Sequence, residues 1–71
     1  MKLYEVYLNN GMCYGDKREI NRMIVATSMK EAITRGKALL LSEMSKQIDK
    51  NKSYFEVVEI TEIDGYNIRV D

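Results

Sequence analysis

The chain has 71 residues, of which 45% are hydrophobic, and its eleven Lys and Arg residues balance its eleven Asp and Glu residues. This length fits one small domain, which buries only about 60% of the surface of its unfolded chain and is marginally stable alone. A net charge of zero lacks the basic footprint of general nucleic-acid binders, and no apolar run approaches the roughly 18 residues of a membrane span.

Two strands are predicted in the first part of the chain. Residues 2–8 alternate, which places one set of side chains on each face of a strand: Tyr4, Val6 and Leu8 against Leu3, Glu5 and Tyr7. Residues 19–27 alternate in the same way, with Ile20, Ile24 and Ala26 against Asn21, Met23 and Val25. The loop between them, residues 9–18, exceeds the usual hairpin length of about two to five residues, so we expect it to be mobile or a contact surface.

A capping box marks the start of one helix. The Ser28 hydroxyl is expected to accept from the Glu31 N–H, and the Glu31 carboxylate to reach back to the Ser28 N–H. From Met29 to about Ile48 apolar residues recur at helical spacing, which predicts an amphipathic helix. Its apolar stripe includes Gly36, whose missing side chain allows close approach to a sheet. The predicted core places four helix residues on five strand residues: Ile33, Gly36, Leu40 and Met44 on Tyr4, Val6, Leu8, Ile24 and Val57.

The C-terminal part of the chain is predicted to be a β-hairpin. Residues 54–63 and 66–70 are rich in strand formers, and Asp64-Gly65 between them is the signature of a two-residue type I′ turn. That turn pairs Ile63 with Tyr66 and Thr61 with Ile68, and the inward-facing residues become Phe55, Val57, Thr61, Ile63, Tyr66, Ile68 and Val70. Glu59 also falls on the inner face, which predicts a bulge or an edge position.

The predicted order is therefore ββαββ over residues 1–71. It describes a single α+β domain with one amphipathic helix packed on a mostly antiparallel sheet, in which the order of the strands stays open.

Catalytic and cofactor chemistry finds little support in the residues. The chain has no His, the usual acid, base and metal ligand near neutral pH. Its lone thiol, Cys13, has Lys17 and Arg18 nearby to favour a thiolate but no base, so an ordinary free cysteine is the better interpretation. Glu56 and Glu62 would lie about 20 Å apart along one strand, too far for paired-carboxylate hydrolysis. We expect no enzyme activity, metal or cofactor, and, without signal-peptide features, a cytoplasmic location.

Protein binding is the function that the composition favours. Five Met and five Tyr exceed what one helix on one sheet face can hide, so a protein partner or a homodimer is expected. The expected contact residues lie on the outward side of the first two strands and in the loop: Leu3, Tyr7, Met12, Tyr14, Met23 and Val25. Val58 and Ile60 would extend the same apolar stripe. The alternative is that these residues are ordinary strand formers, singly exposed.

Nucleic-acid binding is the second candidate. Lys17, Arg18 and Arg22 cluster near the start of the second strand, and Tyr7 and Tyr14 could offer stacking faces beside them. An accessory protein that binds nucleic acid would use these residues.

The passage Val25-Ala26-Thr27-Ser28-Met29-Lys30-Glu31-Ala32, after the N-terminal Lys2-Leu3-Tyr4-Glu5-Val6-Tyr7, resembles small uncharacterised proteins of bacteriophages and mobile elements in low-GC bacteria. The resemblance covers about half of the chain. It implies a setting in which short proteins act by binding and blocking host proteins, immune nucleases among them. The balanced charge departs from the strongly acidic composition expected of a DNA mimic.

Overall fold

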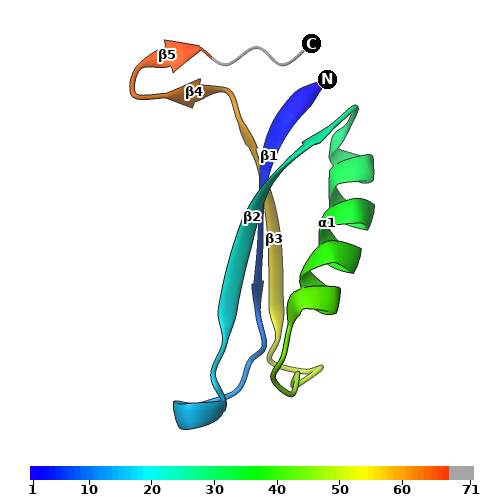
Figure 1. Ribbon diagram of the computed structural model, residues 1–71, viewed down its shortest axis with the longest axis vertical. Coiled ribbons are helices and arrows are strands. Elements are labelled where there is room, and N and C mark those ends of the chain that lie inside the picture. The colour runs from blue at the N-terminus through cyan, green and yellow to red at the C-terminus, as the bar shows by residue number, and fades with distance from the viewer. Residues whose placement is uncertain (68–71) are drawn as a thin grey trace.

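A computed structural model describes residues 1–67 of the chain and shows one helix packed on an antiparallel sheet (Figure 1). The sheet has the order β2-β1-β3, with β1 (Lys2–Asn9) between β2 (Glu19–Ala26) and β3 (Tyr54–Ile60). The helix α1 (Met29–Glu43) crosses one face of it, and a 3-10 turn, η1 (Tyr14–Asp16), lies between β1 and β2. The predicted α+β architecture is confirmed.

The strand alternation is also confirmed. In the regular register of β1 with both neighbours, Val6 lies opposite Arg22 and Val57, and Leu8 lies opposite Ile20 and Phe55. Side chains of even number in β1 and β2 and of odd number in β3 thus point toward α1. The buried apolar residues that result are Tyr4, Val6, Leu8, Ile20 and Ala26 of the sheet and Ala32 and Leu40 of the helix.

The helix touches the sheet along a narrow line of residues spaced by four: Ala32, Gly36 and Leu40. Gly36 makes this contact possible, because a Cβ atom there would lie 2.5 Å from Cγ1 of Val6. The predicted close approach at Gly36 is therefore confirmed. The prediction that Ile33 joins the core is wrong, because Ile33 lies one residue around the helix from this line and is 43% exposed.

The helix begins where the capping box predicts it. The Glu31 N–H donates to the Ser28 hydroxyl at 3.2 Å, as expected. The return bond differs by one residue: the Glu31 carboxylate accepts from the Thr27 hydroxyl (2.8 Å) and the Thr27 N–H (3.3 Å) rather than from Ser28. Ser28 has an extended backbone, which brings the groups of Thr27 within reach of the carboxylate.

Asn10 joins two loops at the end of the sheet. Its side chain is fully buried, and its amide nitrogen donates to the carbonyl oxygens of Asp16 (2.7 Å) and Gln47 (2.9 Å). Its side-chain oxygen accepts from the N–H groups of Met12 (3.2 Å) and Arg18 (2.9 Å). This uses the full hydrogen-bonding capacity of a carboxamide. The base of the loop between β1 and β2 is therefore held in place.

The same residue accounts for an error in the predicted helix end. The helix was expected to reach about Ile48, but it ends at Glu43 with Met44 as its cap. The Gln47 carbonyl instead accepts a hydrogen bond from the Asn10 side-chain amide, and the Asp49 N–H donates to the Asn10 main-chain carbonyl at 2.8 Å. These tertiary bonds satisfy backbone groups that a continued helix would otherwise pair.

The C-terminal hairpin consists of β4 (Glu62–Ile63) and β5 (Tyr66–Asn67) and projects from the end of the main sheet (Figure 1). Asp64 and Gly65 have φ of 52° and 81°, as a type I′ turn requires, and Ile63 faces Tyr66 as predicted.

The expected burial of Thr61 and Ile63 is wrong, since both are exposed. If the β1–β3 register continued, Thr61 would lie opposite Lys2, which is the first residue of β1. Residues after Thr61 therefore have no residue of β1 to pair with. Glu59 occupies the predicted edge position without a bulge, and its carboxylate lies 3.8 Å from Nζ of Lys2. The predicted positions of Ile68 and Val70 lie outside the described residues.

Candidate functional site

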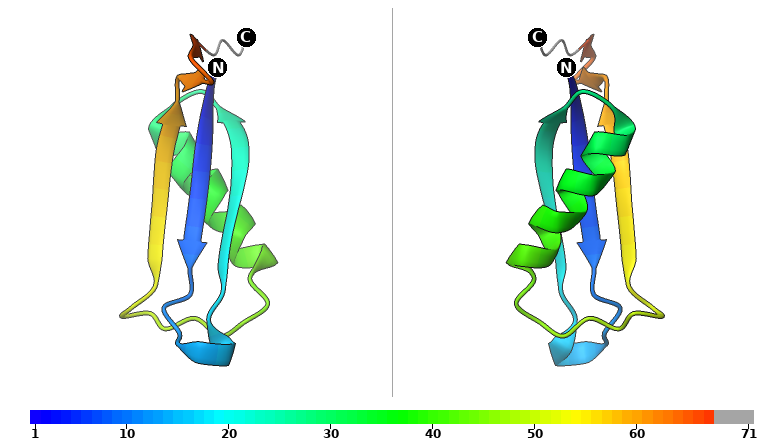
Figure 2. Two further views of the ribbon diagram at one scale, coloured as in Figure 1. Left: turned by 90° about the vertical axis from the view of Figure 1, so that its left-hand side faces the viewer. Right: turned by 90° about the vertical axis from the view of Figure 1, so that its right-hand side faces the viewer.

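The candidate site is the sheet face opposite α1, here called the open face. Figure 2 shows that α1 lies on one side of the sheet only, and the hairpin lies beyond the end of the strands. The open face carries the odd-numbered residues of β1 and β2 and the even-numbered residues of β3. Its character changes along the strands, from apolar near the start of β1 to aromatic and polar near the β1–β2 loop.

The apolar end of the open face, here called the apolar patch, holds Leu3, Met23, Val25, Val58 and Ile60. Leu3 lies between Val25 and Ile60 in one row across the three strands. In the next row Met23 and Val58, which are 49% and 44% exposed, flank Glu5. The two rows cross the same three adjacent strands, so the five side chains are neighbours on this face. Met23 and Val58 are its exposed members, and Leu3, Val25 and Ile60 are half-buried.

Glu5 is the single charge within this patch. Its side chain is half-buried between Met23 and Val58, and it forms no ion pair or hydrogen bond with any residue of the described range 1–67. A carboxylate without a protein partner is solvated by water. Anything that covers the patch must therefore replace that water with a donor or a cation.

The other end of the open face carries an aromatic pair. The rings of Tyr7 and Tyr54 meet edge to face, with centroids 6.1 Å apart and an interplanar angle of 61°. The Asn9 amide donates to the Tyr7 hydroxyl at 3.3 Å. A hydrogen bond to the Glu56 carboxylate, and the charge of that carboxylate, raise the pKa of Tyr54. The two edge-to-face rings therefore place an aromatic surface beside the apolar patch.

The structure brings together four of the six predicted protein-binding residues. Leu3, Tyr7, Met23 and Val25 all lie on the open face. Met12 lies in the loop beyond the far end of β1, and Tyr14 opens η1 in the same loop. From Leu3 to the end of β1 the strand rises about 20 Å. The loop therefore belongs to a different part of the surface from the apolar patch.

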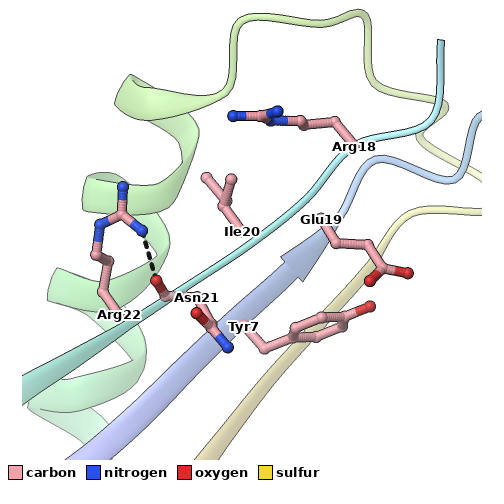
Figure 3. A pocket seen from close by; sticks show the side chains of 6 residues that line it. All are labelled: Tyr7, Arg18, Glu19, Ile20, Asn21 and Arg22. Carbon is pink, nitrogen blue, oxygen red and sulfur yellow. Dashed lines mark hydrogen bonds between the residues drawn. The ribbon is translucent and has the colours of Figure 1, made fainter. Parts of the chain in front are cut away.

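The predicted basic cluster is not presented to one side. Arg22 lies opposite Val6 and so faces the helix, where it pairs with Glu43 at 2.8 Å. Lys17 pairs with Glu19 at 3.4 Å. Arg18 is exposed and, with Tyr7 and residues 19–22, lines an open hollow of about 330 Å³ (Figure 3). Figure 3 shows Arg18 and Arg22 pointing away from the ring of Tyr7.

Two residues of the site were missed from the sequence. Tyr54 could be assigned to the aromatic pair only once β3 was known to lie beside β1 with Asn9 opposite Tyr54. Glu5 was placed on the outward face, but its position at the centre of an apolar surface depends on both neighbouring strands. The strand order, which the alternation leaves open, was the missing signal.

No group of three His, Cys, Asp or Glu residues within 1–67 is arranged to hold a metal ion. The helix in this range is not long and apolar enough to cross a membrane. Comparisons with models of known families, with curated proteins and with solved structures found no match to this chain.

Proposed function

We propose that this protein acts by binding another protein through the apolar patch of the open face. The observation that carries the proposal is a contiguous apolar surface on three adjacent strands that no element within residues 1–67 covers. Monomeric proteins seldom expose large apolar surfaces of this kind without an interaction to make. Met23 adds adaptability, because an unbranched thioether side chain can repack against different partners.

Glu5 indicates the chemistry of the partner. Burying its carboxylate without a counter-charge would cost several kcal/mol, on the order of the penalty for an unpaired ion in an interface. A fitting partner presents Lys or Arg among apolar side chains. Two copies of this chain stacked face to face would bring both Glu5 carboxylates into one interface, so we assign the patch to a different protein. Blocking of a host protein by a phage-encoded chain, which the sequence resemblance implies, would use this surface.

A nucleic-acid-binding accessory role is the second candidate, and the pair of exposed Tyr54 and half-buried Tyr7 favours it as a stacking surface. The charges weigh against it. Lys17 and Arg22 are each paired with a glutamate, which leaves Arg18 as the basic residue of that cluster without an ion pair within the described range. A surface that holds phosphates needs several uncompensated cations.

The test is capture of proteins from a bacterial lysate by the immobilised chain, quantified by mass spectrometry for wild type and variants. Met23→Glu and Tyr7→Glu should each lose the proteins that the wild type enriches, because they place a new charge in the interface. Met29→Glu is the matched control: Met29 is also exposed, at 40%, but lies at the start of α1 on the covered side of the sheet. Thermal melting confirms that each variant is folded. Equal enrichment by Met23→Glu and Met29→Glu would contradict the proposal.

The second candidate is tested by fluorescence anisotropy with a single-stranded oligonucleotide over a range of salt concentrations. We expect no binding by the wild type, and no loss of protein capture when Lys17→Glu and Arg18→Glu are combined. Salt-sensitive oligonucleotide binding that the double variant loses and Met23→Glu retains would favour the nucleic-acid role instead.

A further inference from the structure

The sheet has two edges, β2 and β3, and they differ in how their outward backbone groups are covered. In an antiparallel ladder alternate residues turn their N–H and C=O groups toward the neighbouring strand and away from it. The Asn10 N–H donates to the Arg18 carbonyl at 3.1 Å and continues the β1–β2 ladder. The backbone N–H and C=O groups of even-numbered residues in β2 therefore point to β1, and those of odd-numbered residues point away from the sheet.

The outward carbonyls of β2 are partly covered by arginine. Arg35 of the helix donates to the Val25 carbonyl at 2.7 Å, and Arg22 donates to the Asn21 carbonyl at 2.6 Å. Charged side chains laid over an edge are a known means of preventing strand addition. The β2 edge is therefore protected against a further strand.

The β3 edge has no such cover. The backbone groups of the even-numbered residues of β1 bond to β2, so those of the odd-numbered residues bond to β3. In β3 the partners of these odd-numbered residues are even-numbered, and the backbone N–H and C=O groups of Phe55, Val57 and Glu59 therefore point outward. Within residues 1–67 these groups have no hydrogen-bond partner. The strand sequence Tyr-Phe-Glu-Val-Val-Glu-Ile is rich in the residues that favour strands. Its free groups match those of another extended strand.

The helix leaves an apolar flank on the same side. Arg35 donates to the Val25 carbonyl of β2, which identifies the helix flank that faces β2. Ile33 lies on the opposite flank, toward β3, and is 43% exposed. Phe55 and Val57 point to the helix side of the edge strand and are only half-buried. A further strand beside β3 would cover these three side chains.

We propose that the β3 edge pairs antiparallel with β3 of a second copy, about a two-fold axis at Val57. This axis superimposes the strand Tyr54–Ile60 on its full length. It sets each glutamate opposite an apolar residue, Glu56 across from Val58 and Glu59 across from Phe55. An axis at Glu56 would instead put two carboxylates directly opposite, which is destabilising. The product is a six-stranded sheet with both helices on one face.

This dimer uses an edge and leaves the open face free, so it stands independently of the proposed function. It also adds burial to a small chain, since domains of about 60 residues bury only about 60% of the surface of their unfolded chains and are marginally stable alone.

Amide hydrogen exchange of the ¹⁵N-labelled wild type, measured at low and high concentration alongside sedimentation, tests the pairing. Dimer formation should slow exchange at Phe55, Val57 or Glu59 by roughly tenfold or more, because these amides are unbonded in the monomer. The outward amides of Asn21 and Met23 on β2 are the internal control and should stay fast. A monomer at millimolar concentration, or protection on β2 in place of β3, would overturn the proposal.

A proline pair provides the matched variants. Glu59→Pro removes an outward N–H that the monomer does not use, and should abolish the dimer while the chain stays folded. Asn21→Pro makes the same change on the β2 edge and should leave the dimer intact. Persistence of the dimer in Glu59→Pro would contradict the assignment. Met23→Glu should leave it unchanged, which separates this result from failure of the proposed function.

Discussion

Asn10 illustrates how one polar residue can determine the course of two loops. It is fully buried, and its side chain accepts from the N–H of Met12 in one loop and donates to the carbonyl of Gln47 in the other. In the sequence, Asn9-Asn10-Gly11 indicates only that a strand ends. A turn signal is local, whereas the bond to Gln47 joins residues far apart in the chain, so no periodicity could show it.

Replacing Asn10 by Ala should lower the free energy of unfolding by about 2–4 kcal/mol, because four backbone groups lose a buried partner. Urea denaturation measures the loss. Asn10→Asp keeps both acceptor contacts and loses both donor contacts, and should also destabilise. Asn51→Ala, at an exposed position, is the control. A loss below about 0.5 kcal/mol for Asn10→Ala, typical of surface changes, would contradict this role.

Gly36 is the second residue on which the packing depends, because it allows α1 to approach Val6 closely. Alanine there would gain about 1 kcal/mol of helix propensity, but its Cβ would meet Val6 at 2.5 Å, and overpacking costs about 1–3 kcal/mol. We expect Gly36→Ala to be less stable than wild type by urea denaturation, and the loss to shrink in a Val6→Ala background. Gly15→Ala, whose Cβ would meet nothing within 4 Å, should be neutral. A more stable Gly36→Ala protein would show that helix and sheet are not in this close contact.

At the scale of elements, local sequence signals predicted where an element begins better than where it ends. The helix start follows from Ser28 and Glu31, whose interaction spans one turn. The helix end follows from tertiary bonds to Asn10, and the end of β3 in the main sheet follows from where β1 begins. Alternation placed Leu3, Met23 and Val25 on the correct face, because side-chain direction within a strand needs no knowledge of its neighbours.

The helix start also gives a pH-dependent prediction. Hydrogen bonds from the Thr27 hydroxyl and N–H, and then from Arg35, hold the pKa of Glu31 below its ordinary value. A carboxyl with a lowered folded pKa adds stability above its unfolded pKa of about 4.3, and this is lost as the pH falls through the folded pKa. The melting temperature of Glu31→Gln should therefore fall less than that of wild type on acidification below about pH 4.3. Glu62→Gln, at an exposed site, is the control. Parallel acid profiles for wild type and Glu31→Gln would contradict the role given to this carboxylate.

At the scale of the molecule, a single helix on a three-stranded sheet leaves the surfaces that the proposed binding would use. One helix covers one face of three strands, so the opposite face and the β3 edge both stay open within the described residues. The apolar composition of the sequence indicated such a surface. The separation of the patch from Met12 and the loop could not be predicted, since it depends on how far the strands extend.

Site-specific cross-linking tests the central claim, that the open face binds protein, most directly. Cys13 is the only cysteine, so a Cys13→Ser chain can carry a single benzophenone-labelled cysteine at a chosen position. Met23→Cys reports on the open face and Met29→Cys on the helix side. We expect irradiation in a bacterial lysate to yield discrete cross-linked proteins from the label at Met23 and none from that at Met29. Cross-links from Met29 with none from Met23 would contradict the account.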